Sequence, residues 1–224
     1  MKRWATVLFF LALVVPSPLA AQWYGEASVT SDYRDRGVSY SGGDVAVQGL
    51  IERGFDSGLN LGVWASTLRQ APGGDAEVNI YASYGKDMGA VGFWSLGAQY
   101  VGFVGAPGTD YGEVFAAIGV DYGLAVASLG LSYTPSRNDI KAGGDLYTQA
   151  RIDAHWPGRP YGASARLGYD RLEKLTDKWD WSLGLFYRWR AATLSLDYVD
   201  SARANAQVFA RRGATIVGAV KLSF

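Results

Sequence analysis

Apolar and polar residues alternate along most of this chain with a period of two, the pattern of strands that bury one face. The clearest case is segment 179–190. One of its faces would carry three tryptophans, two leucines and a tyrosine. The other would carry one aspartate, two arginines, Phe186 and small residues. Each strand of this kind therefore has one uncharged apolar face and one face that carries charge.

Twelve segments show this alternation, and most are 9 to 12 residues long. They are 23–33, 45–55, 59–66, 76–86, 90–101, 111–122, 124–133, 145–156, 161–170, 179–190, 192–200 and 214–224. A tilted strand needs about 9–11 residues to cross a bilayer, whereas strands of soluble domains average nearer 5 or 6. The lengths favour membrane-crossing strands.

The connections between these segments alternate strictly between long and short. The tight ones are 56–58, 87–89, 123, 157–160 and 190–192; the longer ones are 34–44, 67–75, 102–110, 134–144, 171–178 and 201–213. In an up-and-down barrel this puts every tight turn at one end, as in outer-membrane barrels. We predict an all-β chain forming a single antiparallel transmembrane barrel of about 12 strands, with short periplasmic turns and longer external loops.

Aromatic residues gather near the predicted strand ends, where amphipathic rings would sit at the lipid headgroups. The outer rim would contain Tyr33, Tyr100, Tyr133, Tyr169, Trp181 and Tyr198. The inner rim would contain Phe55, Trp94, Trp156, Trp189 and Phe224. A soluble all-β domain is the alternative, but its core aromatics would lie in mid-strand. Two girdles instead indicate contact with outer-membrane lipid.

The first 21 residues have the pattern of a cleavable signal peptide: two basic residues, an apolar stretch, then prolines and small residues. We expect cleavage after Ala21 and a barrel over 22–224. Without the leader the net charge is −2, which gives no reason to expect a nucleic-acid partner. No cysteine is present, so disulfides and cysteine-bound metals are excluded.

A charge on the lipid face would cost ~2–4 kcal/mol at mid-depth, so the charged faces should point into the lumen. The predicted pore-lining residues are Asp32, Arg34, Arg36, Gln48, Glu52, Trp64, Glu77, Glu113, Asp121, Arg151, Asp153, Arg166, Asp180 and Arg188. Either they line a narrow passive channel for ions or small polar solutes, or they pair across a sealed structural barrel whose loops bind a partner. Acidic residues outnumber basic ones at the lumen-facing positions, which favours cations or polar neutral solutes as the transported species.

Catalytic chemistry has little support. A membrane hydrolase of the Ser–His–acid kind would need His155, the single histidine, which we interpret as an interior or interfacial residue near Asp153. The glycine-rich stretches lack the strand–loop–helix context of phosphate loops. No metal-ligand spacing is visible, and we expect neither a cofactor nor enzymatic activity.

The stretch SDYRDRGVSYSGG, residues 31–43, begins a set of motifs that resembles the TorF family of Gram-negative, porin-like outer-membrane proteins. The matching residues are Ser31, Asp32, Tyr33, Arg36, Gly37, Ser39, Gln48, Gly49, Ser57, Gly58, Gly62, Trp64, Ala65 and Ser66, with 77–84 as the next strand. Val45 departs from the pattern. The resemblance implies a porin-like barrel, with 37–43 in its first external loop. The terminal Phe224 resembles the signal read by the barrel-assembly machinery.

Overall fold

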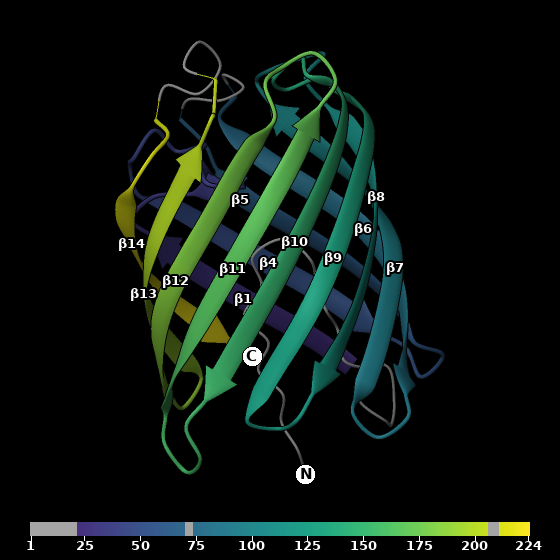
Figure 1. The fold of residues 1–224 in the computed structure, drawn as a ribbon, viewed down its shortest axis with the longest axis vertical. Coiled ribbons are helices and arrows are strands. Elements are labelled where there is room, and N and C mark those ends of the chain that lie inside the picture. The colour runs from purple at the N-terminus through teal and green to yellow at the C-terminus, as the bar shows by residue number, and fades with distance from the viewer. Residues whose placement is uncertain (1–21, 70–73, 206–210) are drawn as a thin grey trace.

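A computed structural model describes residues 22–69, 74–205 and 211–224. Twelve long antiparallel strands close into a barrel, each paired with its neighbours along the chain, and β1 pairs with β14 at the seam (Figure 1). They are β1 (Gln22–Thr30), β4 (Ala46–Gly54), β5 (Leu59–Thr67), β6 (Ala76–Met88), β7 (Gly92–Val104), β8 (Tyr111–Asp121), β9 (Ala125–Arg137), β10 (Gly143–His155), β11 (Tyr161–Leu172), β12 (Lys178–Trp189), β13 (Ala192–Ala202) and β14 (Thr215–Ser223). In this part of the chain no helix has the length and apolarity to cross a membrane.

The predicted fold class is therefore confirmed, and so is the strand number. The boundaries differ at the end that carries the long connections. Strand β9 continues to Arg137 and β10 begins at Gly143, so this hairpin is longer than predicted. Strand β1 instead stops at Thr30, three residues before the predicted end. The predicted leader, residues 1–21, lies outside the described residues.

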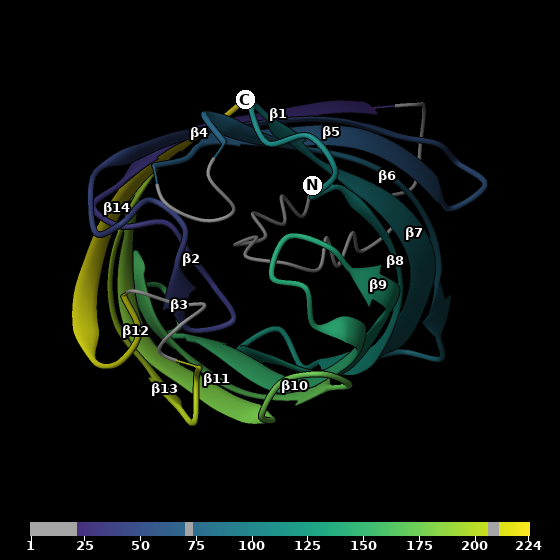
Figure 2. The same ribbon diagram turned by 90° about the horizontal axis from the view of Figure 1, so that it is seen from above.

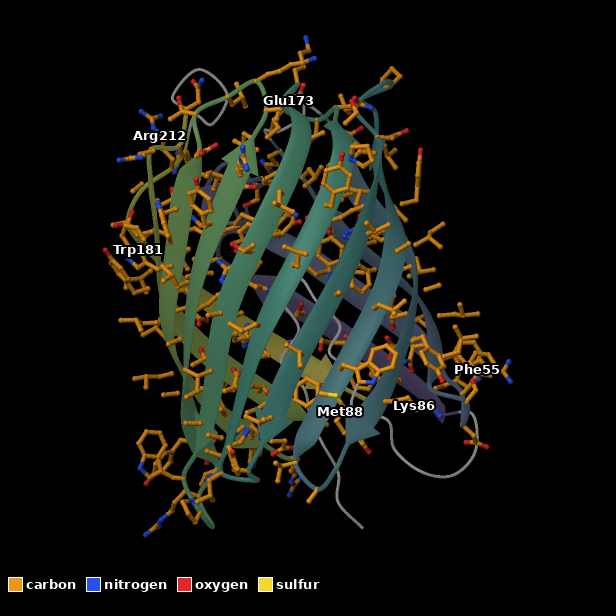
Figure 3. All side chains as sticks on the ribbon, turned by 45° about the vertical axis from the view of Figure 1, so that its right-hand side comes forward. Phe55, Lys86, Met88, Glu173, Trp181 and Arg212 are labelled. Atoms are coloured by element: carbon orange, nitrogen blue, oxygen red, sulfur yellow. The ribbon has the colours of Figure 1, made fainter. Side chains whose placement is uncertain are left out.

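Alternation places apolar side chains outside and polar ones inside. In β12 the side chains of Leu183 and Leu185 are 61% and 63% exposed on the outer surface, whereas Asp180 is buried in the interior. Figure 3 shows Trp181 and Phe55 on the outside of the wall. An apolar belt of this kind is stable only against lipid or another apolar phase, because water would have to cover it otherwise.

The two ends of the barrel differ as predicted. Tight turns occupy one end, where Lys86 and Met88 lie, and the longer connections gather at the other, with Glu173 and Arg212 (Figure 3). Between the long strands the shortest connection is the two-residue turn from β12 to β13. The sequence pattern of long and short connections is thus the pattern of the folded barrel.

Most predicted girdle residues lie on the outer surface, but Tyr33 does not. Its side chain is fully buried, inside the segment that follows β1. The prediction for Tyr33 was wrong because it extended the period of β1 beyond Thr30, where the chain leaves the wall. Tyr100, Tyr133, Trp156, Trp189, Tyr198 and Phe224 are exposed, and Phe55, Trp94, Tyr169 and Trp181 are half-buried.

The barrel is closed where the last residue meets the first strand. The Gly25 N–H donates to the Phe224 carbonyl at 2.8 Å, and the Phe224 N–H donates back to Gly25 at 3.0 Å. The Phe224 ring lies over Gly25, and a Cβ added to Gly25 would come within 2.2 Å of that ring. Glycine is required there because only hydrogen leaves room for the aromatic ring.

Candidate functional site

The segment between β1 and β4 folds into the barrel as a small hairpin. Strands β2 (Arg34–Asp35) and β3 (Val38–Ser39) pair with each other and lie inside the ring of long strands (Figure 2). Arg36 and Gly37 form a two-residue turn with φ of 46° and 81°. Hairpin turns of the I′ type need positive φ at both positions, which glycine adopts freely and arginine does not. We call residues 31–44 the lumen hairpin.

The base of the lumen hairpin is organised around one carboxylate. Asp32 Oδ1 accepts hydrogen bonds from Ser39 Oγ at 2.5 Å, Ser41 Oγ at 3.0 Å and the Gly43 N–H at 3.2 Å. Its Oδ2 accepts from Arg34 Nε at 2.7 Å. Short hydroxyl side chains and a glycine are therefore what let the chain wrap around Asp32. The SDYRDRGVSYSGG motif encodes this local turn network.

One side of the lumen hairpin is apolar and packs against residues of β4, β7, β8 and β11 and of the connections that follow β5, β7 and β9. The ring centroid of Tyr33 lies 5.7 Å from that of Tyr40 and 5.5 Å from that of Trp64. The cluster comprises Tyr33, Val38, Tyr40, Ala46, Leu68, Val101, Phe103, Ala106, Tyr111, Ile140, Ala142 and Leu172. The Tyr33 hydroxyl also donates to Glu77 Oε2 at 2.9 Å. Trp64, predicted to line a pore, instead packs against this cluster.

The tip of the lumen hairpin is tied to the opposite wall by Arg36. Its Nη1 donates to Asp145 Oδ2 at 2.8 Å and to Asp170 Oδ1 at 3.4 Å, and its Nη2 donates to Glu113 Oε2. The guanidinium also lies 4.4 Å from the ring centroid of Tyr147. Strands β8, β10 and β11 thus all hold one side chain. We call Arg36 and these three carboxylates the tip clamp.

Two further basic residues complete the interactions around the tip clamp. Arg137 donates to Asp145 Oδ2 at 2.8 Å and to Asp35 Oδ2 at 2.9 Å. Lys178 Nζ lies 2.8 Å from Asp170 Oδ2 and donates to the Arg36 carbonyl at 2.9 Å. Both the side chain and the backbone of the hairpin tip are therefore fixed. Charges this deeply buried are stable only when paired.

Electrostatics keeps the hairpin in its charged, bonded state. Burial alone would lower the pKa of Arg36, but the Asp145 and Glu113 carboxylates overcome it and raise that pKa well above its usual value. Burial raises the pKa of the Tyr33 phenol, and the Glu77 charge adds to the effect. Arg36 therefore stays a cation and Tyr33 stays a neutral donor.

A cavity of about 100 Å³ remains beside the lumen hairpin. It is bounded by the hairpin, β1 and β4 on one side and by β10 to β14 on the other, so this cavity lies to one side of the barrel axis. Its charged lining residues are Asp32, Arg34, Asp35, Arg36, Arg151, Arg166, Asp197 and Lys221. The lining also contains Ser28, Thr30, Ser164, Ser182, Thr193 and Ser195. The rest of the lining includes the apolar residues Ala165, Leu185, Phe186, Val199, Val217 and Ala219. The charged and hydroxyl groups among them provide partners for water, ions or polar solutes.

The predicted pore-lining residues fall into three groups. Glu77, Glu113 and Asp180 contact the lumen hairpin or its immediate neighbours. Asp32, Arg34, Arg36, Gln48, Arg151 and Arg166 line the cavity, where Arg166 Nη2 lies 3.0 Å from Asp180 Oδ1. Others lie elsewhere in the interior or at its edge. Glu52 accepts from the Tyr81 hydroxyl at 2.6 Å, Asp153 accepts from Arg151, and the Arg188 guanidinium lies over Phe186.

Residues at the tight-turn end have local roles. Asp121 Oδ1 accepts from the Gly123 N–H at 2.7 Å and caps the turn after β8. The ring centroid of His155 lies 5.3 Å from that of Phe186, at an edge-on angle. Among the described residues no group of histidines and acids is arranged to hold a metal ion.

Several residues of the tip clamp and of its immediate surroundings were not among the predicted site residues. Asp170 and Lys178 have the same strand parity as Arg166 and Asp180, so the alternation itself could have assigned them to the interior. Arg137 was missed because segment 124–133 was ended too early. No alternation pattern places Asp35 in the interior, because its position depends on the hairpin turn.

Two solved structures with a TM-score above 0.5 support the fold. The chain superimposes on the structure named KdgM porin with a TM-score of 0.64 and 12% identity, covering 91% of this chain and 99% of that one. A structure titled "Unveiling the Mechanism Behind the in-meso Crystallization of Membrane Proteins" gives 0.54 and 10% identity, covering 90% and 83%. The outer membrane protein OpdK from Pseudomonas aeruginosa gives 0.49 at 16% identity, and this chain covers 58% of it.

No curated protein matches the sequence. A family model described as "Bacterial protein of unknown function (Gcw_chp)" matches residues 19–224, which include all twelve wall strands and the lumen hairpin. This chain belongs to that family.

Proposed function

We propose that this chain is an outer-membrane protein that forms a small passive channel for ions or small polar solutes, constricted by the lumen hairpin. The apolar outer belt supports a membrane location, and the KdgM porin fold is consistent with it. The TorF resemblance of 31–66 supports the same function. The observation that carries the proposal is the cavity beside a firmly anchored hairpin, with eight charged side chains in its lining.

The anchoring is what makes a passive constriction physically reasonable. A mobile loop would block and unblock the lumen, whereas the tip clamp and the apolar cluster fix the hairpin on both sides. The cavity beside the fixed hairpin is lined by β1, β4 and β10 to β14. Twelve strands enclose a lumen between that of filled eight-stranded barrels and that of open porins of 16 to 18 strands. A hairpin in such a lumen leaves room for small solutes.

Purified protein in planar bilayers and in proteoliposomes tests the proposal. We expect small stepwise conductances, and liposome swelling with urea and glycerol but not with sucrose. A correctly folded barrel that is silent in both assays would contradict the proposal. Swelling with sucrose at the same rate as with glycerol would contradict the constriction.

A sealed barrel is the second candidate, and one observation favours it. The charges at the hairpin tip are almost all paired, as expected for a packed interior. Its external loops would then bind a partner. A wild-type barrel that is silent but conducts once the lumen hairpin is removed would show that the hairpin seals the barrel.

Phe224 supports a further part of the proposal. We expect this terminal aromatic residue, exposed at the barrel seam, to be the residue read by the barrel-assembly machinery. We assign no catalytic role to His155, which packs against Phe186. Neither a cofactor nor nucleic acid has a place in this proposal.

A further inference from the structure

We propose that the cavity beside the lumen hairpin is an anion subsite, which would make the channel prefer small anions over cations. The inference rests on the proposed channel function. It differs from what the overall charge of the interior suggests, since acidic residues outnumber basic ones there. The reason lies in where the acids are.

Much of the interior acid excess is used to hold the hairpin. Asp145, Asp170 and Glu113 bind Arg36, and Asp35 binds Arg137. Glu77 binds Tyr33 beneath the hairpin. Of these five carboxylates, only Asp35 lines the cavity. Their negative charge is therefore largely neutralised by their partners, and it contributes little to the electrostatic potential in the cavity.

The cavity lining has the opposite balance. Among the described residues it has five basic side chains and three acidic ones. Four of the basic ones come from four different elements: Arg34 from the hairpin, Arg151 from β10, Arg166 from β11 and Lys221 from β14. The cations thus surround the space rather than forming one exposed patch.

The carboxylates that pair with three of these cations stand outside the lining. Arg151 Nε lies 2.6 Å from Asp153, Arg166 Nη2 3.0 Å from Asp180, and Lys221 Nζ 3.0 Å from Glu26. None of these three acids lines the cavity, whereas all three cations do. An ion in the cavity is therefore closer to the basic member of each pair. Rings of charge arranged in this way select ions of the opposite sign.

Two local arrangements provide donors for an anion. Arg151 and Arg166 are directly opposite each other on β10 and β11, so their guanidinium groups add to one local positive potential, which their partners Asp153 and Asp180 offset only in part. Lys221 on β14 lies opposite Ser28 on β1 and opposite Thr193 on β13. The buried Lys221 Nζ makes no hydrogen bond of good geometry. Guanidinium, ammonium and hydroxyl groups together suit chloride or a small carboxylate.

Reversal potentials in a KCl gradient across a planar bilayer test the inference. We expect the wild-type channel to pass chloride more readily than potassium. The double variant Arg151→Gln, Lys221→Gln should lower the chloride-to-potassium permeability ratio by roughly threefold or more. Asp197→Asn removes the carboxylate that β13 contributes to the same lining, and it should raise this permeability ratio. Lys86→Gln, at the exposed tight-turn end, is the matched control and should leave it unchanged.

The outcomes separate the two proposals. A conducting wild-type channel that prefers potassium overturns the anion subsite and leaves the channel function standing. Chloride preference that survives Arg151→Gln, Lys221→Gln also overturns it, because the selectivity would then arise elsewhere. A silent wild-type barrel overturns the channel function and with it the subsite. Should the double variant fail to fold, the single variant Arg151→Gln decides, since its side chain is partly exposed.

Discussion

Arg36 and Asp145 are 109 residues apart in the sequence and joined by a hydrogen bond of 2.8 Å inside the barrel. The first is the tip of the lumen hairpin and the second lies at the start of β10 on the opposite wall. This contact turns a loop that would otherwise hang outside the membrane into part of the interior. Together with the other contacts of the tip clamp and with the apolar cluster, it holds the hairpin inside the barrel.

Replacing Arg36 should release the hairpin tip. Arg36→Ala leaves Glu113, Asp145 and Asp170 without their shared partner, and removing one member of a buried ion pair costs ~3–5 kcal/mol. We expect larger and noisier single-channel currents. Arg69→Ala is the control, because Arg69 pairs with Asp44 at 3.6 Å on the exposed surface. Equal currents in Arg36→Ala and wild type would show that the clamp does not hold the constriction.

Gly37 should be equally sensitive for a steric reason. A Cβ there would approach the Asp180 Cβ to 2.7 Å and the Ser201 Cβ to 2.9 Å, and the φ of 81° disfavours any other residue. We expect Gly37→Ala to undock the hairpin and raise conductance. Gly218→Ala, where a Cβ meets nothing within 4 Å, should behave as wild type. If both variants conduct alike, the tight approach of Gly37 to the wall is not essential.

Leu183 tests the lipid-facing belt. Leu183→Arg puts a charge on the outer surface in mid-strand, which should lower the free energy of unfolding from lipid vesicles by ~2–4 kcal/mol. Leu124→Arg, in the turn between β8 and β9, should cost only about 0–1 kcal/mol because it lies at the barrel end. Urea unfolding in vesicles measures both. Equal costs would argue against a bilayer around the barrel.

Phe224 tests the seam and the assembly signal separately. Phe224→Ala removes the ring that covers Gly25, and we expect slower assembly into the outer membrane in cells. Phe224→Tyr retains the ring and should assemble normally. If Phe224→Ala assembles poorly in cells but refolds normally in vesicles, the residue acts as a signal. Normal assembly in cells would contradict that role.

Much of the wall could be predicted from the sequence, because lipid outside and water inside impose the same alternation on every strand. Leu183 and Asp180 fall on opposite faces for that reason alone. The alternation of tight turns and long loops then determined the topology. These features are local, so a single sequence carries them.

The lumen hairpin could not be predicted in the same way. Tyr33 continues the period of β1, yet the chain turns inward after Thr30, and it then reverses and returns to the wall through positive-φ positions at Gly37, Gly42 and Gly43. The partners of Arg36 come from three strands that meet it only after the barrel closes. Long-range ion pairing of this kind leaves no periodic trace in the sequence.

The most direct test of the account is the single-channel conductance of a variant in which residues 33–42 are replaced by a short Gly-Ser linker. The β4 and β1 strands stay intact, so the wall should still fold, as the shift in gel mobility on heating would verify. We predict that this variant conducts several times more current than wild type, because the hairpin no longer constricts the lumen. Equal conductance in the folded variant and wild type would contradict the claim that the hairpin sets the size of the channel.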